Sequence, residues 1–289
     1  MNKENPRKKH RPFLIPALAL GALCLNQATR VSVSNYVVEH EKLPEAFDGF
    51  RILHISDLHS NKLLCRAGRL AEKVRNLSPD LIVVTGDLVD SVRVDFETPV
   101  RFIANAAKIC PVYYVPGNHE ARIRHRDILF RSLAAAGANL LFDKREVVRR
   151  NGAEISITGI LDPRFCPHAS RLTPPGMRTL VRLRNLRDGD NERYRILLSH
   201  RPEFADIYSG EGFDLVFSGH AHGGQWRIPM LGAVYSPGQG LFPEYTGGLH
   251  RVSGTEMVVS RGLGNSEFPI RINNPFELVF VTLRHKKTF

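Results

Sequence analysis

The sequence predicts an α/β fold in which two packed, mixed β-sheets are flanked by helices. Short apolar runs closed by polar residues or glycine, as at residues 52–55 and 81–85, are typical of buried strands. Amphipathic segments connect the first of these runs, which indicates parallel strand–helix–strand units. After residue 140, strand-like runs follow one another with few helices between them. This change predicts a second sheet packed on the first.

The first half of the chain alternates expected strands and helices. Residues 31–38 alternate apolar and polar side chains, as an edge strand does. Leu70, Val74 and Leu77 have helical spacing within residues 66–77, and Gly137 is a typical helix end. We expect strands at residues 52–55, 81–85 and 112–115, and helices at residues 66–77, 96–108 and 122–137.

The second half of the chain is expected to supply most of the second sheet. The runs expected to form it lie at residues 146–148, 155–159, 257–260 and 277–283, and further strand-like runs lie at residues 195–198 and 213–218. Residues 173–193 are basic and contain Pro174, Pro175 and Gly176. They are expected to form a solvated helix and loop, or else part of a surface for an anionic substrate.

Polar side chains that bind metals follow five of the expected strands directly. They are Asp57, His59, Asp87, Asn118, His200, His220 and His222. Ligands in α/β proteins gather at the carboxyl ends of strands, where loops from several strands converge. We therefore expect these side chains to lie together. An Asp-x-His pair alone is a weak signal, and the recurrence along the chain is what makes it informative.

Seven potential ligands are too many for one tetrahedral metal and suit two metals that share a bridging carboxylate. Carboxylate and imidazole ligands together suit manganese, iron or zinc. Two such ions about 3.5–4 Å apart can clamp a phosphoryl group and hold a bridging hydroxide for in-line attack. The sequence thus indicates a binuclear site for two divalent metal ions.

The same blocks, in the same order and spacing, resemble those of the calcineurin-like metallophosphoesterase superfamily. The resemblance covers residues 50–224 and rests on Asp57-Leu-His59, Gly86-Asp87, Gly117-Asn-His-Glu120, His200 and Gly219-His-Ala-His222. It implies a four-layer α/β/β/α sandwich. It also implies a hydrolase of phosphodiester or pyrophosphate bonds that uses the metal-bridging hydroxide as its nucleophile.

Site roles are carried over from this resemblance residue by residue. Asp57, His59 and His222 would bind one metal, and Asn118, His200 and His220 would bind the other. Asp87 would bridge the two metals. His119 would bind no metal but face the phosphoryl oxygens or the leaving group, as a general acid or a charge stabiliser. Manganese is the expected metal, with iron or zinc as alternatives.

A second resemblance involves residues 42–50, 199–203, 219–225, 261–266 and 271–274. These segments are similar to a bacterial branch of membrane-associated metallophosphoesterases. That branch contains general phosphodiesterases and also enzymes that hydrolyse UDP-2,3-diacylglucosamine in lipid A biosynthesis, and the resemblance does not choose between them. An inactive phosphate-binding scaffold is the alternative of another class, and the intact ligand set argues against it.

The N-terminal region predicts a membrane-associated protein. Residues 1–12 are basic, residues 13–25 are apolar, and residues 31–289 form the expected metallophosphoesterase domain. The apolar run is shorter than a typical membrane span. A cleaved signal, an uncleaved anchor and an interfacial helix are the alternatives, and we expect an uncleaved anchor in the cell membrane. The side of the membrane is left open.

The charge of the chain indicates anionic partners. Its 40 Lys and Arg exceed its 29 Asp and Glu, giving a formal net charge of +11. We expect a phosphorylated small molecule or a lipid nucleotide as substrate and a membrane surface as partner. No nucleic-acid-binding motif is visible in the sequence. The four cysteines show no close pairing pattern, which favours reduced thiols. The oligomeric state stays open.

Several further residues are candidates for a role near the site, and some of them allow two interpretations. Glu120 either orients a neighbouring ligand or acts as an acid at a helix N-terminus. Asp162 either forms a turn before proline or lines the pocket. Arg201 and Arg261 are expected phosphate contacts. Residues 235–245 form a Gly- and Pro-rich loop that either seats an acyl chain or membrane surface, or packs against the domain.

Overall fold

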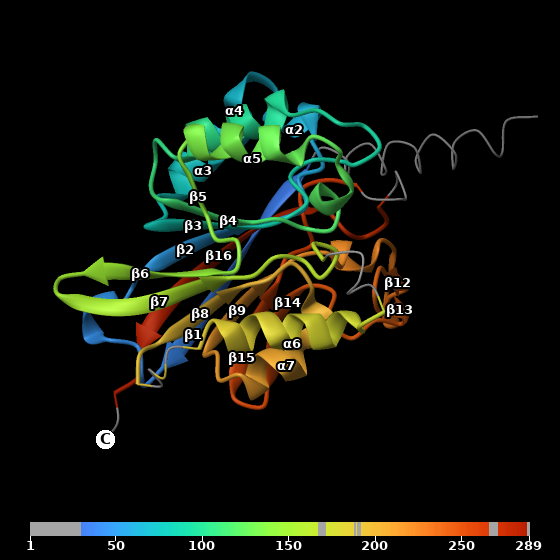
Figure 1. Ribbon diagram of the computed structural model, residues 1–289. Coiled ribbons are helices and arrows are strands. Elements are labelled where there is room, and N and C mark those ends of the chain that lie inside the picture. Colours follow the sequence, from blue (N-terminus) through green and yellow to red (C-terminus); the bar gives the residue numbers. More distant parts are fainter. Residues whose placement is uncertain (1–29, 167–171, 188, 190–191, 266–270, 288–289) are drawn as a thin grey trace, which may run out of the picture.

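The computed structural model describes residues 30–287 except 167–171, 188, 190–191 and 266–270. Two six-stranded sheets face each other, and helices cover the outer face of each sheet (Figure 1). Helices α2 to α5 lie on one side, and α6 and α7 lie on the other. The four layers confirm the fold class predicted from the sequence.

The first sheet has the strand order β1-β16-β2-β3-β4-β5. Its strands are β1 (Val31–His40), β2 (Arg51–Ile55), β3 (Leu81–Thr85), β4 (Val112–Val115), β5 (Ala138–Leu140) and β16 (Phe276–His285). Its helices are α2 (Lys62–Cys65), α3 (Arg69–Leu77), α4 (Glu97–Ala106) and α5 (Arg126–Ala135). Strands β2 to β5 run parallel, as expected for strands joined by crossover helices.

The second sheet has the strand order β14-β15-β9-β8-β7-β6. Its strands are β6 (Lys144–Arg150), β7 (Ala153–Gly159), β8 (Arg195–Leu198), β9 (Leu215–Ser218), β14 (Gly248–Val252) and β15 (Thr255–Val259). Its helices are α6 (Pro175–Asn185) and α7 (Ala205–Gly210). Two small hairpins are formed by β10 (Arg227–Ile228) with β11 (Gly232–Ala233), and by β12 (Tyr235–Ser236) with β13 (Gly240–Leu241).

Short 3₁₀ helices complete the chain. They are Glu45–Phe47, Arg66–Gly68, Glu120–Arg122, Pro202–Phe204 and His222–Gly224. The second lies within the helix expected at residues 66–77, and the third overlaps the start of the helix expected at residues 122–137, so the sequence pattern placed both helices a few residues too long.

The inner faces of the two sheets form the central apolar core. Ile52 and Val83 of the first sheet pack there with Ile157, Ile196 and Phe217 of the second. Fully burying side chains of this size stabilises the fold by about 1.5–3 kcal/mol each. The core therefore fixes the distance between the sheets, and with it the distance between the loops at their ends.

Residues 277–283 were expected in the second sheet, and this prediction was wrong because they belong to strand β16 of the first sheet. This strand lies inside the first sheet, parallel to β1 and antiparallel to β2. Leu278 faces the core under the helices, whereas Val279 and Val281 face the core between the sheets. Most of this strand is apolar, as is typical of a strand buried on both faces, so its pattern does not tell which sheet receives it.

The prediction of a membrane-anchored protein is corrected as well. Among the residues that the structure describes, none belongs to a helix that is both long and apolar enough to cross a membrane. Residues 1–12 and 13–25, on which the prediction was based, lie outside the described residues.

Candidate metal centre

The ends of five strands bring the predicted ligands together. Asp57 and His59 follow β2, Asp87 follows β3, and Asn118 follows β4 of the first sheet. Residues His200 and His220 follow β8 and β9 of the second sheet, with His222 close behind. All seven side chains are buried. Both sheets therefore contribute to one site.

The backbone at this site is strained. Positive φ angles occur at Asp57 (52°), His59 (46°), Asp87 (50°), His220 (65°) and His222 (48°). A left-handed conformation costs a residue with a side chain roughly 1–2 kcal/mol. Such residues gather where the surrounding structure holds them for a function.

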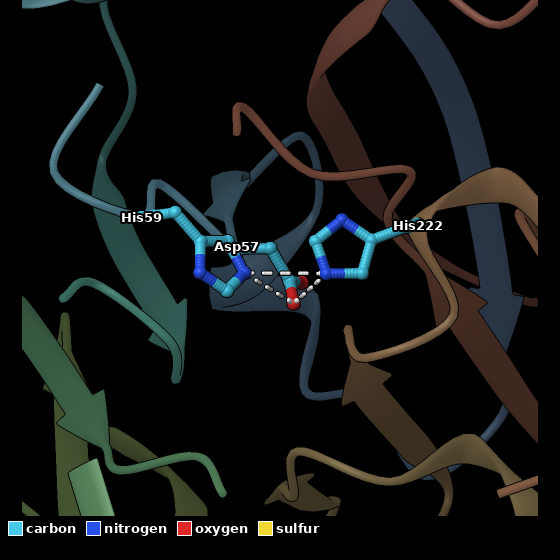
Figure 2. A group of neighbouring side chains, drawn as sticks. All are labelled: Asp57, His59 and His222. Atoms are coloured by element: carbon cyan, nitrogen blue, oxygen red, sulfur yellow. Dashed lines mark hydrogen bonds and ion pairs between the residues drawn. The ribbon is translucent and has the colours of Figure 1, made fainter. Parts of the chain in front are cut away.

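Asp57, His59 and His222 form the first ligand group (Figure 2). Their ligand atoms all lie within 4.8 Å of one another. The Nε2 atoms of His59 and His222 are 3.2 Å apart, and Asp57 Oδ1 is 3.2 Å from His222 Nε2. Figure 2 shows the three side chains pointing toward a common point.

Asp87, His200 and His220 form the second ligand group, again within 4.8 Å. His200 Nδ1 donates a hydrogen bond to the Thr85 carbonyl over 2.6 Å, so its Nε2 is the atom free to bind a metal. That Nε2 lies 3.2 Å from Asp87 Oδ2 and 3.1 Å from Asn118 Oδ1. Asn118 thereby joins this group.

Each of the two aspartates uses one oxygen to hold the backbone and presents the other to the site. Asp57 Oδ2 accepts the backbone N–H of His220 at 3.1 Å, and Asp87 Oδ1 accepts that of His119 at 2.8 Å. Asp87 Oδ2 lies 3.2 Å from His200 Nε2 and 3.9 Å from His59 Nε2. This oxygen therefore faces both ligand groups.

The donor atoms fit divalent metal ions. Asp57 Oδ1 is buried and accepts no well-aligned hydrogen bond from the described residues. Burial would raise the pKa of Asp87, but His200 and His119 hold it well below its usual value. Burial, followed by the charges of His200 and Arg201, lowers the pKa of His220 far below its usual value. Ionised carboxylates and neutral imidazoles are the forms that bind metals.

His119 lies at the edge of both groups. Its Nε2 is 4.0 Å from Asp87 Oδ2. Its Nδ1 accepts the backbone N–H of Ser91 at 3.1 Å, so the ring proton of the neutral form is on Nε2. Burial is the main cause that lowers the pKa of His119 and favours this neutral form.

Asp90 was not among the residues predicted from the sequence. It forms a third candidate metal group with His59 and His119, and its Oδ2 lies 3.7 Å from His59 Nδ1. Contact with the other ring nitrogen orients a histidine that binds a metal through Nε2. The only sequence signal was a second carboxylate three positions after Asp87.

Glu120 acts on the backbone of the ligand loops. Its fully buried carboxylate accepts the N–H groups of Gly117 at 2.8 Å, Asp87 at 3.0 Å and Val89 at 3.1 Å. Burial, with the nearby Asp87 charge, raises the pKa of Glu120 to about 7. Of its two readings from the sequence, the structure supports the role of orienting its neighbours.

Arg271 was also missed as a neighbour of the site. It is buried, and its Nη2 lies 3.2 Å from His222 Nδ1. The same side chain donates to the carbonyl oxygens of Arg261 and Gly264. Asn274 donates to the His222 carbonyl over 2.7 Å. The segment at residues 271–274 thus holds the His222 loop in place.

A cavity of about 260 Å³ opens onto the site. Its lining residues are Asp87, Asn118, His119, Arg122, Arg164, Arg201, His220, His222, Tyr235, Pro237 and Gly238. The β12–β13 hairpin, part of the loop expected at residues 235–245, therefore forms one wall. Leu241 and Phe242 of the same loop are exposed.

The two arginines predicted as phosphate contacts differ in their surroundings. Arg201 lines the cavity and pairs with Asp162 at 2.6 Å and Glu203 at 3.0 Å. Arg261 pairs with Glu277 at 2.8 Å and does not line this cavity. Asp162 forms the predicted turn, because it accepts the backbone N–H of Arg164 at 2.8 Å; it does not line the cavity itself but pairs with Arg201, which does.

Comparisons with known proteins show which family the chain resembles. The sequence profile of the calcineurin-like phosphoesterase family matches residues 50–224. An uncharacterized metallophosphoesterase of Aquifex aeolicus is 30% identical over 93% of this chain and 98% of its own. Phosphodiesterase YaeI of Escherichia coli is 25% identical over 81% of this chain and 82% of its own. The crystal structure of TT1561 of Thermus thermophilus matches with a TM-score of 0.51 at 14% identity, over 74% of this chain and 90% of that one.

Proposed function

The chain belongs to the calcineurin-like phosphoesterase family, and on this premise we propose that it hydrolyses phosphodiester or pyrophosphate bonds with two divalent metal ions. The family establishes a phosphoesterase that uses divalent metal ions. The bond type and the number of ions are part of the proposal. The observation that carries it is the position of Asp87, whose Oδ2 faces both ligand groups.

The proposed ligand assignment follows the two groups. Asp57, His59 and His222 would hold one ion. Asn118, His200 and His220 would hold the second ion, with Asp87 shared between the two. When bound, such ions stabilise negative charge on phosphoryl oxygens and lower the pKa of water. We propose manganese, with iron or zinc as alternatives that the same ligands accept.

The protein side chains would position the substrate and manage one proton. His119 carries its proton on Nε2, which lies 4.0 Å from Asp87 Oδ2 beside the proposed phosphoryl position. It can donate this proton to the leaving oxygen. Buried ligand side chains around the centre limit access of bulk water to the reacting group.

The substrate is proposed to be a phosphorylated small molecule. A phosphodiester is supported by the name of the relative YaeI, a phosphodiesterase. The narrower hypothesis, UDP-2,3-diacylglucosamine and a role in lipid A biosynthesis, rests on the sequence resemblance alone. Hydrolysis of this lipid nucleotide would distinguish the narrower hypothesis from a general phosphodiesterase.

The test uses the full-length protein loaded with Mn²⁺. Hydrolysis of bis(p-nitrophenyl) phosphate, p-nitrophenyl phosphate and UDP-2,3-diacylglucosamine is compared at equal enzyme concentration. We expect diester cleavage to exceed monoester cleavage. Release of UMP from the lipid nucleotide would support the narrower hypothesis. Two bound metals without hydrolysis of any of these substrates would contradict the proposal and favour a phosphate-binding scaffold.

A further inference from the structure

A second, larger cavity adjoins the one over the metal centre. Its volume is about 720 Å³, compared with about 260 Å³ for the first. Both cavities share the same three arginines in their lining, namely Arg122, Arg164 and Arg201. The arginines therefore lie where the two cavities meet, next to His119, His220 and Asp87.

Two of these arginines differ from the third in their partners. Arg201 is largely buried and is paired with both Asp162 and Glu203. Arg122 and Arg164 are exposed, and neither side chain makes a hydrogen bond or ion pair with another described residue. The two nearby carboxylates are thus engaged by Arg201. Arg122 and Arg164 thus form no ion pair with a described carboxylate at the cavity junction, although the charges of Asp162 and Asp87 reach Arg164.

The arginines are close enough to influence one another. Burial first, and then the positive charges of Arg122 and Arg201, lower the pKa of Arg164. Arg122 also contributes to the lowered pKa of His119, after burial and other charges. An anion between Arg122 and Arg164 would relieve this repulsion. It would lie beside the metal centre, because His119 and Asp87 line the same cavity.

We propose that Arg122 and Arg164 form a second phosphate subsite, which makes a pyrophosphate diester the preferred substrate class. The inference rests on the proposed function and deepens it. The scissile phosphoryl group would lie at the metal centre, and the adjacent phosphate would lie between the two guanidinium groups. Guanidinium groups bind phosphate through paired, charge-assisted hydrogen bonds. The larger cavity would receive the group attached to this second phosphate.

A diester with a single phosphate has no second phosphate group that this subsite could bind. Its leaving group carries no charge next to the scissile bond, so Arg122 and Arg164 would not contact an anion. A pyrophosphate diester places its second phosphate directly beside the first. The structure therefore predicts selectivity between two substrates that make the same contacts at the metal centre.

The experiment compares the double variant R122Q/R164Q with R75Q/R131Q. Arg75 on α3 and Arg131 on α5 are exposed and line neither cavity, so the control loses the same charge elsewhere. Calorimetry on the metal-free, full-length proteins measures the affinity for inorganic pyrophosphate and for orthophosphate. Kinetics with Mn²⁺ compare UDP-glucose, a pyrophosphate diester, with bis(p-nitrophenyl) phosphate. Circular dichroism verifies that the variants are folded.

We expect R122Q/R164Q to weaken pyrophosphate binding by about tenfold or more, and the control to change it much less. The loss in kcat/KM for UDP-glucose should exceed the loss for the single-phosphate diester by about tenfold. Equal losses for both substrates, or unchanged pyrophosphate affinity, would overturn the subsite. Absence of hydrolysis in every protein, with pyrophosphate binding lost only in R122Q/R164Q, would retain the subsite and overturn the proposed function.

Discussion

Glu120 Oε2 accepts the backbone N–H of Asp87 at 3.0 Å, and the same oxygen accepts that of Gly117 at 2.8 Å. One carboxylate oxygen thus joins the loop after β3 to the loop after β4. Both loops carry proposed metal ligands, so the distance between these ligands depends on a side chain that is not itself proposed to bind metal.

Glu120→Gln should weaken metal binding without removing a ligand. An amide NH₂ cannot accept hydrogen bonds, so at least one of the buried N–H groups now bonded to Glu120 would lose its partner. We expect the free energy of unfolding to fall by about 2–3 kcal/mol. Mn²⁺ affinity should fall by about 10–100-fold. Urea unfolding and metal titration measure the two effects. Glu72→Gln, at an exposed position on α3, is the control and should change neither.

His119→Ala should separate chemistry from metal binding. We expect kcat for the chromogenic diester to fall by about 10²–10⁴-fold, because a proton donor is lost. Metal content, measured by atomic emission, should stay close to that of the unchanged protein. Asp87→Ala should lose both activity and metal. If His119→Ala loses metal as Asp87→Ala does, the role proposed for His119 is wrong.

Metal binding at neutral pH should release a proton from His200. Burial acts to lower the pKa of His200, but the Asp87 carboxylate outweighs it and raises this pKa to about 10. Without metal, the ring is therefore protonated at pH 7, whereas Nε2 must be neutral to bind a metal. Calorimetric titration with Mn²⁺ in two buffers of different ionisation enthalpy should give at least about one proton released, because the pKa of the neighbouring ligand His59 is raised as well. Equal heats in both buffers would contradict the assignment.

The raised pKa of His200 also makes the stability of the metal-free protein depend on pH. A pKa raised above the usual 6.5 means that folding stabilises the protonated ring of His200. This contribution is fully present below about pH 6.5 and is lost as the pH rises toward about 10. Mn²⁺ affinity should change in the opposite direction over this range, because protons compete with the metal. Urea unfolding of the metal-free protein as a function of pH measures the first effect.

Gly219 follows strand β9 of the second sheet. Gly219→Ala should nevertheless disturb the first ligand group, which includes Asp57 of the first sheet. A Cβ at this position would overlap the Ser56 hydroxyl and the Asp57 carboxylate. We expect destabilisation of roughly 1–3 kcal/mol and weaker metal binding. Gly210→Ala is the matched control, because a Cβ there meets nothing within 4 Å. Similar losses in both variants would show that the effect comes from helix or loop propensity rather than from the overlap.

The sequence was sufficient to predict that the seven proposed ligands lie together, although not that Asp90 and Arg271 lie beside them. Asp57, Asp87 and His200 follow their strands directly, and the end of a strand is local information. Because parallel strands share one edge of a sheet, local information at several strands defines a common site. The change in the connections after residue 140 predicted a second sheet, and the family resemblance implied the four layers.

Features that depend on contacts between distant segments could not be predicted. The apolar pattern of β16 fits either sheet, and only pairing with β1 and β2 decides its place. Whether Glu120 faces solvent or the backbone depends on how closely two loops approach. Arg122 and Arg164 follow different strands in different sheets. Nothing in their local sequence indicates that they line one cavity junction.

The contribution of both sheets to the site has a consequence for the order of folding. His59 and His222 lie 163 positions apart in the chain, yet their Nε2 atoms are 3.2 Å apart. Closing such a long loop is slow and entropically unfavourable until both sheets have formed and docked. The nascent chain therefore cannot offer the first ligand group before His222 has been synthesised. In refolding experiments, high-affinity capture of Mn²⁺ should coincide with the slowest folding phase and so report the completion of folding.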